Sequence, residues 1–141
     1  MGGHGRILLA DDADTERGTL SMYLRTHGYD VTEASNGEFT IAYLQNHEID
    51  VLLLDLNMPV ADGFDVLTYL QKHRRGLPVI LLSGMPLEDI QQHMHGLPQR
   101  ELPPLMIKPL DLDQLIEVLE LQLQGGLPQM PQSDNRSGAE R

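Results

Sequence analysis

The sequence predicts an α/β fold: a doubly wound, five-stranded parallel sheet with helices on both faces. Short apolar segments alternate along the chain with segments of helical periodicity, which is typical of repeated strand–helix–strand units. Residues 51–54 and 79–82 are almost continuously apolar, as expected for strands that are covered on both faces. The chain has 141 residues, which is enough for one domain with one hydrophobic core.

The first strand is expected at residues 6–10 (RILLA), which are mostly aliphatic. Residues 14–28 predict a helix, because Leu20 and Leu24 fall on one face and Gly28 can end it. The remaining strands are expected at residues 29–34, 50–55, 78–83 and 105–108. The remaining helices are expected at residues 36–47, 62–74 and 111–123.

Three of these elements have features that support their assignment. Residues 50–55 (DVLLLD) give the strongest strand signal in the chain. The helix over 62–74 places apolar residues at a spacing of three: Phe64, Leu67 and Leu70. The last helix has an apolar stripe made of Leu112, Leu115, Ile116, Leu119 and Leu123. Val118 and Leu121 lie off that stripe and could form an exposed contact surface.

Two regions break the pattern. A short fourth helix is compatible with residues 87–95, but Gly96 and the prolines that follow prevent its continuation, so we expect a short helix and an irregular loop. Residues 125–141 contain Gly, Pro and polar residues without periodicity, and we expect a disordered tail or a truncated linker there.

The composition excludes several classes of protein. The net charge is −11, from 10 basic and 21 acidic residues, which argues against direct contact with nucleic acid. A divalent cation or a basic protein surface is a compatible partner, although solubility alone can also account for the charge. The chain has no cysteine, no apolar run long enough for a membrane span and no signal-peptide pattern, so we predict a cytoplasmic protein.

Polar side chains follow the expected strands at the points where they end. Asp11 and Asp12 follow the first strand, Asp55 ends the third, Ser83 ends the fourth and Lys108 ends the fifth. Because ligands bind at the carboxyl ends of parallel strands, these residues should meet at one edge of the sheet. Two carboxylates about 4 Å apart repel by roughly 4 kcal/mol at an effective dielectric constant near 20. A hard cation such as Mg²⁺ would relieve this repulsion, so we expect a cation to compensate the charge of Asp55.

Such a group of residues suits phosphoryl transfer. An aspartate can attack phosphorus and form an acyl phosphate. A metal ion and a lysine can then neutralise the charge on the phosphoryl oxygens.

The motifs together resemble the receiver domain of response regulators in two-component signalling, of the chemotaxis-regulator type. The matching stretches are LLADD (8–12), GYDVTEASNGE (28–38), DVLLLDLNMPVADG (50–63), LPVILLSG (77–84) and IKP (107–109). The resemblance extends over residues 5–124, which we take as the receiver domain. It implies a flavodoxin-like sheet with the strand order 2-1-3-4-5.

The resemblance also implies a role for each site residue. Asp55 is the phosphoacceptor. Mg²⁺ (or Mn²⁺) is bound by Asp12, Asp55 and the main-chain carbonyl of Asn57, with Asp11 acting through water. The phosphoryl group contacts Ser83, Gly84 and Lys108.

Further roles follow from the same family. Ser83 switches with the phosphoryl group, and a cis bond precedes Pro109. Asn57 and Met85 tune the rate of dephosphorylation. The implied partners are a histidine kinase or histidine phosphotransfer protein, and an effector protein or an output domain beyond residue 141. No enzymatic turnover is expected beyond the domain's own phosphorylation and dephosphorylation, and no membrane contact.

The sequence departs from the family around its fifth strand. Leu105 replaces the usual aromatic residue of the switch, and GLPQRELPP stands where Gly-Ala is usual. The stretch from Ser83 to Lys108 is also about three residues longer than is common. A receiver-like scaffold that signals through this altered face without phosphorylation is therefore an alternative. An aspartyl-nucleophile phosphatase is another, although the sequence has Asn57 where such enzymes carry a second acid.

Simpler interpretations of single residues also stay open. Asp12 and Asp62 could cap helices, Ser83 could be a turn residue and Lys108 a surface lysine. Pro59 and Gly63 are expected to form the loop rather than take part in chemistry. Surface positions are expected for the six histidines: His4, His27, His47, His73, His93 and His95.

Overall fold

In a computed structural model of the chain, the structure describes residues 5–56, 58, 63–84 and 103–124. The strands are β1 (Gly5–Ala10), β2 (Tyr29–Ala34), β3 (Val51–Asp55), β4 (Val79–Ser83) and β5 (Leu105–Ile107). The helices are α1 (Asp14–Thr26), α2 (Gly37–Asn46), α3 (Gly63–His73) and α5 (Leu112–Leu123). Each of these elements was predicted, with ends that differ by no more than two residues.

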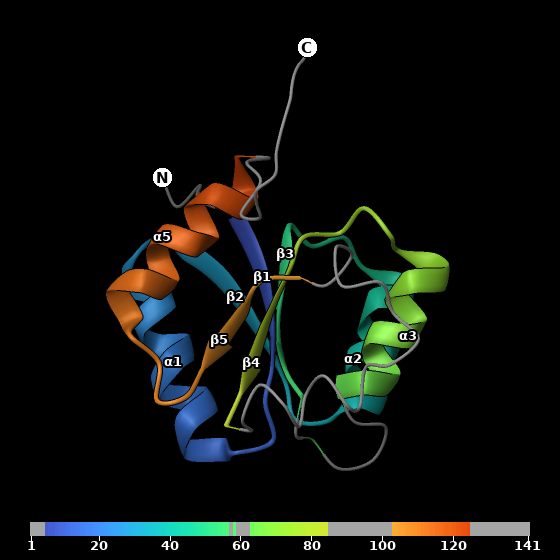
Figure 1. Cartoon of the computed structure of the whole chain (residues 1–141), viewed down its shortest axis with the longest axis horizontal. Helices are drawn as coiled ribbons and strands as arrows, with labels where there is room; N and C mark the ends of the chain where they lie inside the picture. Colours follow the sequence, from blue (N-terminus) through green and yellow to red (C-terminus); the bar gives the residue numbers. More distant parts are fainter. Residues whose placement is uncertain (1–4, 57, 59–62, 85–102, 125–141) are drawn as a thin grey trace.

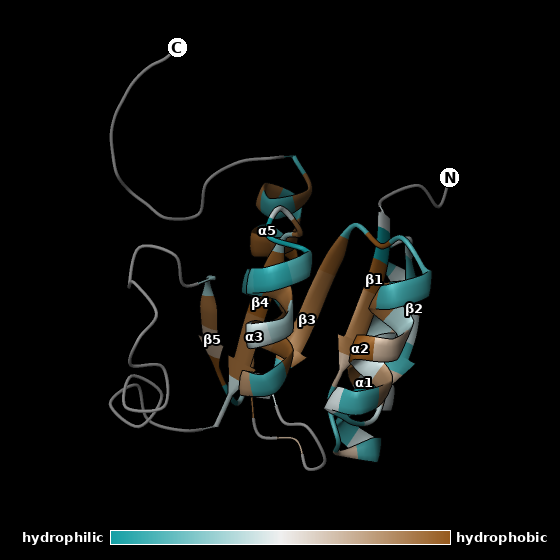
Figure 2. Cartoon of the chain, turned by 90° about the vertical axis from the view of Figure 1, so that its right-hand side faces the viewer, coloured by the Kyte–Doolittle hydropathy of each residue, from teal (hydrophilic) through white to brown (hydrophobic). Residues whose placement is uncertain are grey.

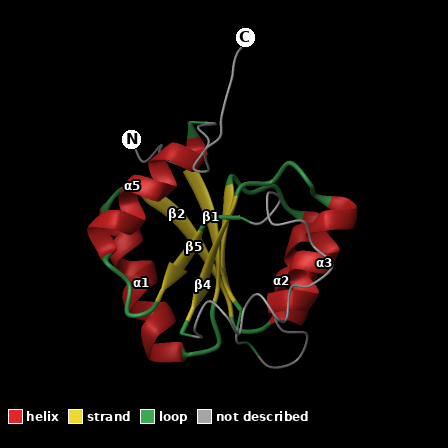
Figure 3. Cartoon of the chain, in the orientation of Figure 1, coloured by secondary structure: helices red, strands yellow, loops and turns green. Residues whose placement is uncertain are grey.

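The strands form one parallel sheet in the order β2-β1-β3-β4-β5, so the predicted fold class and strand order are confirmed. Figures 1 and 3 show three layers, with α1 and α5 on one face of the sheet and α2 and α3 on the other. Because every strand pair is parallel, all five strands point their carboxyl ends toward the same edge.

Alternate residues of the strands supply two separate cores. In β3, Leu52 and Leu54 pack in the cluster that includes α2 and α3, whereas Val51 and Leu53 pack in the cluster that includes α1 and α5. All four side chains are completely buried, which explains the continuous apolar run in the sequence. Figure 2 shows that β3, β4 and most of β1 are apolar, whereas the helices around them carry both polar and apolar residues.

The helices bury the faces that their periodicity predicts. Leu20 and Leu24 of α1 are buried, and α1 ends where Gly28 adopts a positive φ of 91°. In α5, Leu115 and Leu119 are fully buried. The expectation of an exposed pair on α5 is only half right, because Leu121 is exposed but Val118 packs against the core beside α1.

The predicted surface position of the histidines is confirmed for the three that the structure describes. His27, His47 and His73 are exposed and lie at the carboxyl ends of α1, α2 and α3. Within the described ranges, no helix is long and apolar enough to cross a membrane.

Several predictions concern residues outside the described ranges. They are the roles of Asn57, Pro59, Asp62 and Met85, the helix near residues 87–95, the positions of His4, His93 and His95, and the tail at 125–141.

Candidate functional site

The strand register brings the predicted site residues to one edge of the sheet. Asp55 is the last residue of β3 and lies opposite Leu82 of β4, and Ser83 is the last residue of β4. Asp11 follows β1, and its N–H donates to the carbonyl of Ala34 at 3.0 Å. Asp11, Asp55 and Ser83 are therefore held by the sheet backbone itself.

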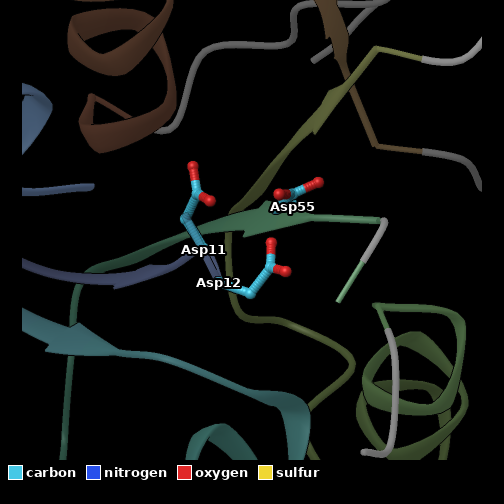
Figure 4. Close-up of side chains that lie close together, drawn as sticks. All are labelled: Asp11, Asp12 and Asp55. Carbon is cyan, nitrogen blue, oxygen red and sulfur yellow. The ribbon is translucent and has the colours of Figure 1, made fainter. Parts of the chain in front are cut away.

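The three aspartates form one acidic cluster. Asp11, Asp12 and Asp55 each offer a carboxylate oxygen, and these atoms lie within 4.8 Å of one another. Figure 4 shows the three side chains gathered at the ends of β1 and β3. Asp11 and Asp55 are each only 2% exposed, whereas Asp12 is open to solvent. The cluster is thus reached from the side of Asp12.

Asp12 does not cap α1, which was one alternative for this residue. The N-cap position belongs to Ala13, which has no side-chain acceptor, and the Ala13 N–H donates to Asp11 Oδ1 at 2.9 Å. The carboxylate of Asp12 therefore has no part in capping the helix, and it faces the cluster.

Lys108 provides the positive charge of the site. Its Nζ donates to Asp55 Oδ2 at 3.2 Å, to Asp11 Oδ2 at 3.4 Å and to Glu16 Oε1 at 3.0 Å. The side chain is 20% exposed, so Lys108 is not an ordinary surface lysine. Burial on its own would lower the pKa of Lys108, but the bond with Glu16 and the charges of Asp55 and Asp11 outweigh burial and raise it. Lys108 therefore stays positively charged and compensates the charge of the buried Asp55 carboxylate.

A backbone hydrogen bond fixes the position of Lys108 at the end of β5. The Lys108 N–H donates to the carbonyl of Ser83 at 2.8 Å, which joins the ends of β4 and β5. The peptide bond from Lys108 to Pro109 is cis, as the resemblance implied.

Ser83 lies at this edge, whereas Leu105 is the first residue of β5 and pairs with Leu81. Ser83 is fully buried and Gly84 after it is exposed, so the hydroxyl belongs to the strand end rather than to an open turn. Leu105 is partly buried and packs against the cluster that includes α2 and α3. Ile107, also on β5, is 48% exposed.

Arg17 is a supporting residue that the sequence reasoning missed. It donates from Nη1 to the main-chain carbonyl of Asp11 at 2.8 Å and from Nε to Glu33 Oε1 at 2.9 Å. Its Nη2 also bonds Asp14 Oδ1 at 2.8 Å. The sequence gives only a weak indication of this role, because Glu33, the partner of Arg17, lies 16 residues further along the chain on β2.

Gly63 has a packing role that the sequence did not specify. It is the first residue of α3, within the helix predicted over 62–74 and not in the loop before it, and it lies directly against the backbone of Asp55 and Leu56. The lack of a side chain therefore lets α3 begin next to the phosphoacceptor candidate.

The donor set fits a hard divalent cation. Carboxylate oxygens are the ligands that Mg²⁺ prefers, and the exposed side of Asp12 leaves room for the waters that this ion retains. The sheet edge thus combines three acids, one lysine and one hydroxyl.

Comparison with protein families gives a match over residues 7–120 to the response regulator receiver domain. The chain belongs to this family. The chain spans only a small part of the length of the curated relatives that it matches. The regulatory protein AtoC of Escherichia coli is 31% identical over 119 residues, which are 84% of this chain and 25% of AtoC. The cyclic-nucleotide phosphodiesterase regA of Dictyostelium discoideum is 39% identical over 59% of this chain and 11% of its own length.

Solved receiver structures have the same fold. The Thermotoga maritima response regulator TrrA, determined in complex with Mg²⁺-BeF, is 26% identical, with a TM-score of 0.72 over 84% of this chain and 98% of TrrA. The receiver domain of the Francisella response regulator 1452 has a TM-score of 0.76 at 24% identity, over 86% of this chain and 98% of that domain.

Proposed function

We propose that this receiver domain accepts a phosphoryl group on Asp55 from a histidine kinase or a histidine phosphotransfer protein and signals by a change of conformation. The observation that carries the proposal is the position of the Asp55 carboxylate, which is buried at a strand end with Lys108 Nζ at 3.2 Å and two further aspartates beside it. A structural ion pair would not require Asp11 and Asp12 at the same place.

The chemistry follows from these contacts. An Oδ atom of Asp55 attacks phosphorus, an O–P bond forms and the P–N bond of the phosphohistidine donor breaks. The imidazole nitrogen leaves with the bonding electron pair. Mg²⁺, when bound by Asp11, Asp12 and Asp55 with the main-chain carbonyl of Asn57, would neutralise charge on the phosphoryl oxygens. Lys108 Nζ already contacts Asp55 Oδ2 and can donate to an equatorial oxygen of the transferred group.

We further propose that the domain acts in the cytoplasm and has no separate substrate to turn over. Its output would pass to an effector protein or to another domain of the same polypeptide. The relatives support an output through another part of the same polypeptide, since they include a sensor kinase/phosphatase and a regulatory protein of which this chain matches only 9% and 25%.

The proposal is tested by incubating the protein with a small phosphodonor, such as acetyl phosphate, and Mg²⁺. Intact mass spectrometry should detect a gain of about 80 Da, the mass of one transferred PO₃ group. Asp55→Asn should abolish the gain. Asp30→Asn is the matched control, because Asp30 is an exposed aspartate near the start of β2, away from the edge of the sheet where Asp55 lies. A wild-type protein that never gains this mass would overturn the proposal, and turnover of a free phosphomonoester would favour a phosphatase instead.

A further inference from the structure

Glu16 is an additional acid at the site, outside the set of residues that the sequence pointed to. It lies in the first turn of α1, and its Oε1 is 3.0 Å from Lys108 Nζ, the shortest of the three carboxylate contacts of that lysine. An ammonium group has three N–H donors. With Asp11, Asp55 and Glu16 as acceptors, all three donors of Lys108 are engaged.

The three acceptors differ in how easily they can be released. The side chains of Asp11 and Asp55 are 2% and 3% exposed, so water cannot replace Lys108 as their partner without rearrangement. The Glu16 side chain is 58% exposed. When Lys108 must donate to a phosphoryl oxygen, the contact with Glu16 is therefore the one that can open at least cost, because water can solvate the freed carboxylate.

Glu16 also lines an open groove beside Lys108. A groove of about 510 Å³ runs between α1 and the segment that follows β5, and Asp11, Glu16, Lys108 and Pro109 are among the residues that line it. The carboxylate of Glu16 thus adds a fourth negative charge near Lys108, on the α1 side of the site.

We propose that Glu16 is a positioning residue that slows phosphorylation of Asp55 by holding one donor of Lys108. This inference rests on the proposed phosphoacceptor function. Phosphorylation requires Lys108 to exchange its bond with Glu16 for one with the phosphoryl group, and the negative charge of Glu16 opposes that exchange. Removing the charge while keeping the shape of the side chain should speed the reaction.

The test compares Glu16→Gln with the wild type in phosphorylation by acetyl phosphate at saturating Mg²⁺, followed by intact mass. We expect the rate constant to rise about two- to fivefold, as expected for the loss of one partly exposed ion pair. Glu16→Asp, which retains the charge, should stay closer to the wild type. Glu38→Gln is the matched control, because Glu38 is an exposed glutamate in the first turn of α2, on the other face of the sheet, and it should leave the rate unchanged.

Two further measurements separate the ion pair from general repulsion of an anionic donor. The increase should become smaller but stay measurable in about 0.5 M potassium chloride, because a pair in direct contact is screened less than charges more than a few ångströms apart. It should be absent when Glu16→Gln is combined with Lys108→Met, whatever rate that background retains. An increase found only at low salt, or unchanged without Lys108, would overturn the inference.

The outcome also separates this inference from the function on which it rests. Phosphorylation of the wild type with no increase in Glu16→Gln would remove the role of Glu16 and leave Asp55 as phosphoacceptor. A wild type that is not phosphorylated would remove both.

Discussion

Gly63 begins α3 in direct contact with the backbone of Asp55. A Cβ atom added to Gly63 would lie 2.6 Å from the carbonyl oxygen of Asp55 and 2.5 Å from Cα of Leu56. Neither neighbour is the end of a flexible side chain that could move aside, so the backbone itself would have to shift. The position of Asp55 therefore depends on a residue with no side chain eight positions further along the chain.

Gly63→Ala should destabilise the fold and disturb the site. We expect a loss of about 1–3 kcal/mol in the free energy of unfolding, as for overpacked interiors, measured by urea denaturation. Phosphorylation of Asp55 should slow as well, because Asp55 would be displaced. Gly18→Ala is the control: no atom lies within 4 Å of its added Cβ, so this change inside α1 should stabilise the protein by about 0.5–1 kcal/mol. Equal effects of the two substitutions would contradict the role of Gly63.

Lys108→Met should cost stability in the absence of a metal ion. The substitution leaves the buried carboxylates of Asp11 and Asp55 without their cation, and we expect a loss of about 1–3 kcal/mol. The pKa of Lys108 is raised in the folded protein, so its contribution is fully present below the unfolded pKa and falls only as the pH rises through the higher folded value. The loss should therefore be the same at pH 7 and pH 9.

Mg²⁺ should recover part of this loss, because a divalent cation can replace the missing charge between the carboxylates. Urea denaturation of Lys108→Met in EDTA and in Mg²⁺ gives the comparison. Should Mg²⁺ stabilise the variant no more than it stabilises Asp55→Asn, the lysine and the metal would not share a site.

Much of this site was predictable because it uses chain positions that follow strands. In a parallel sheet, the last residues of neighbouring strands lie at the same edge. This is why Asp55, Ser83 and Lys108 could be grouped from the sequence. Glu16 and Arg17 could not be found in this way. Their roles depend on which direction each side chain of α1 points, and on partners 92 and 16 residues away in the chain.

The close packing of Gly63 could not be predicted for a related physical reason. A glycine after an aspartate signals a turn, and the sequence has no feature that distinguishes a need for backbone freedom from a need for space. Only the approach of α3 to the end of β3 decides between the two. Likewise, Val118 appeared off the apolar stripe of α5, but α5 buries a wider face than its stripe of leucines suggests.

Glu33 should make stability depend on pH in acid. Burial would raise the pKa of Glu33. The hydrogen bond from Arg17, the nearby hydroxyl of Ser21 and the charges of Arg17 and Arg25 outweigh burial and hold this pKa below its usual 4.5. A lowered pKa in the folded state gives stability that is present above the unfolded pKa and is lost as the pH falls through the folded value. Between pH 6 and about pH 3, the wild type should therefore lose more stability than Glu33→Gln.

Urea denaturation at several pH values measures this difference. Glu48→Gln is the control, because the Glu48 side chain is 80% exposed and lies 3.6 Å from Arg74 in a surface ion pair. Parallel curves of unfolding free energy against pH for the wild type, Glu33→Gln and Glu48→Gln would show that the Arg17–Glu33 pair does not contribute to the pH dependence of stability.

Asp12 should matter more for Mg²⁺ affinity than for folding. It is the exposed member of the acidic cluster, so Asp12→Asn removes a charged ligand without leaving a buried group unpaired. We expect Mg²⁺ affinity, measured by calorimetry, to fall by about tenfold or more, with the urea midpoint in EDTA unchanged or slightly higher, because repulsion between the acids is relieved. Asp30→Asn should change neither. A weaker fold with unchanged Mg²⁺ affinity would mean that Asp12 is structural.

A change at Ser83 should reach β5 although Leu105 replaces the aromatic switch residue. The Lys108 N–H donates to the Ser83 carbonyl at 2.8 Å, and Ser83 pairs with Ile107 in the ladder, so a movement of Ser83 should be transmitted to β5 through the backbone without an aromatic switch residue. Beryllofluoride with Mg²⁺ should therefore shift the amide resonances of Leu105 and Ile107 as well as those of Ser83 and Lys108, and Asp55→Asn should abolish all four shifts. Shifts confined to Ser83 and Lys108 would mean that the conformational change does not extend from the site into β5. That result would favour a scaffold that signals through its altered face without phosphorylation.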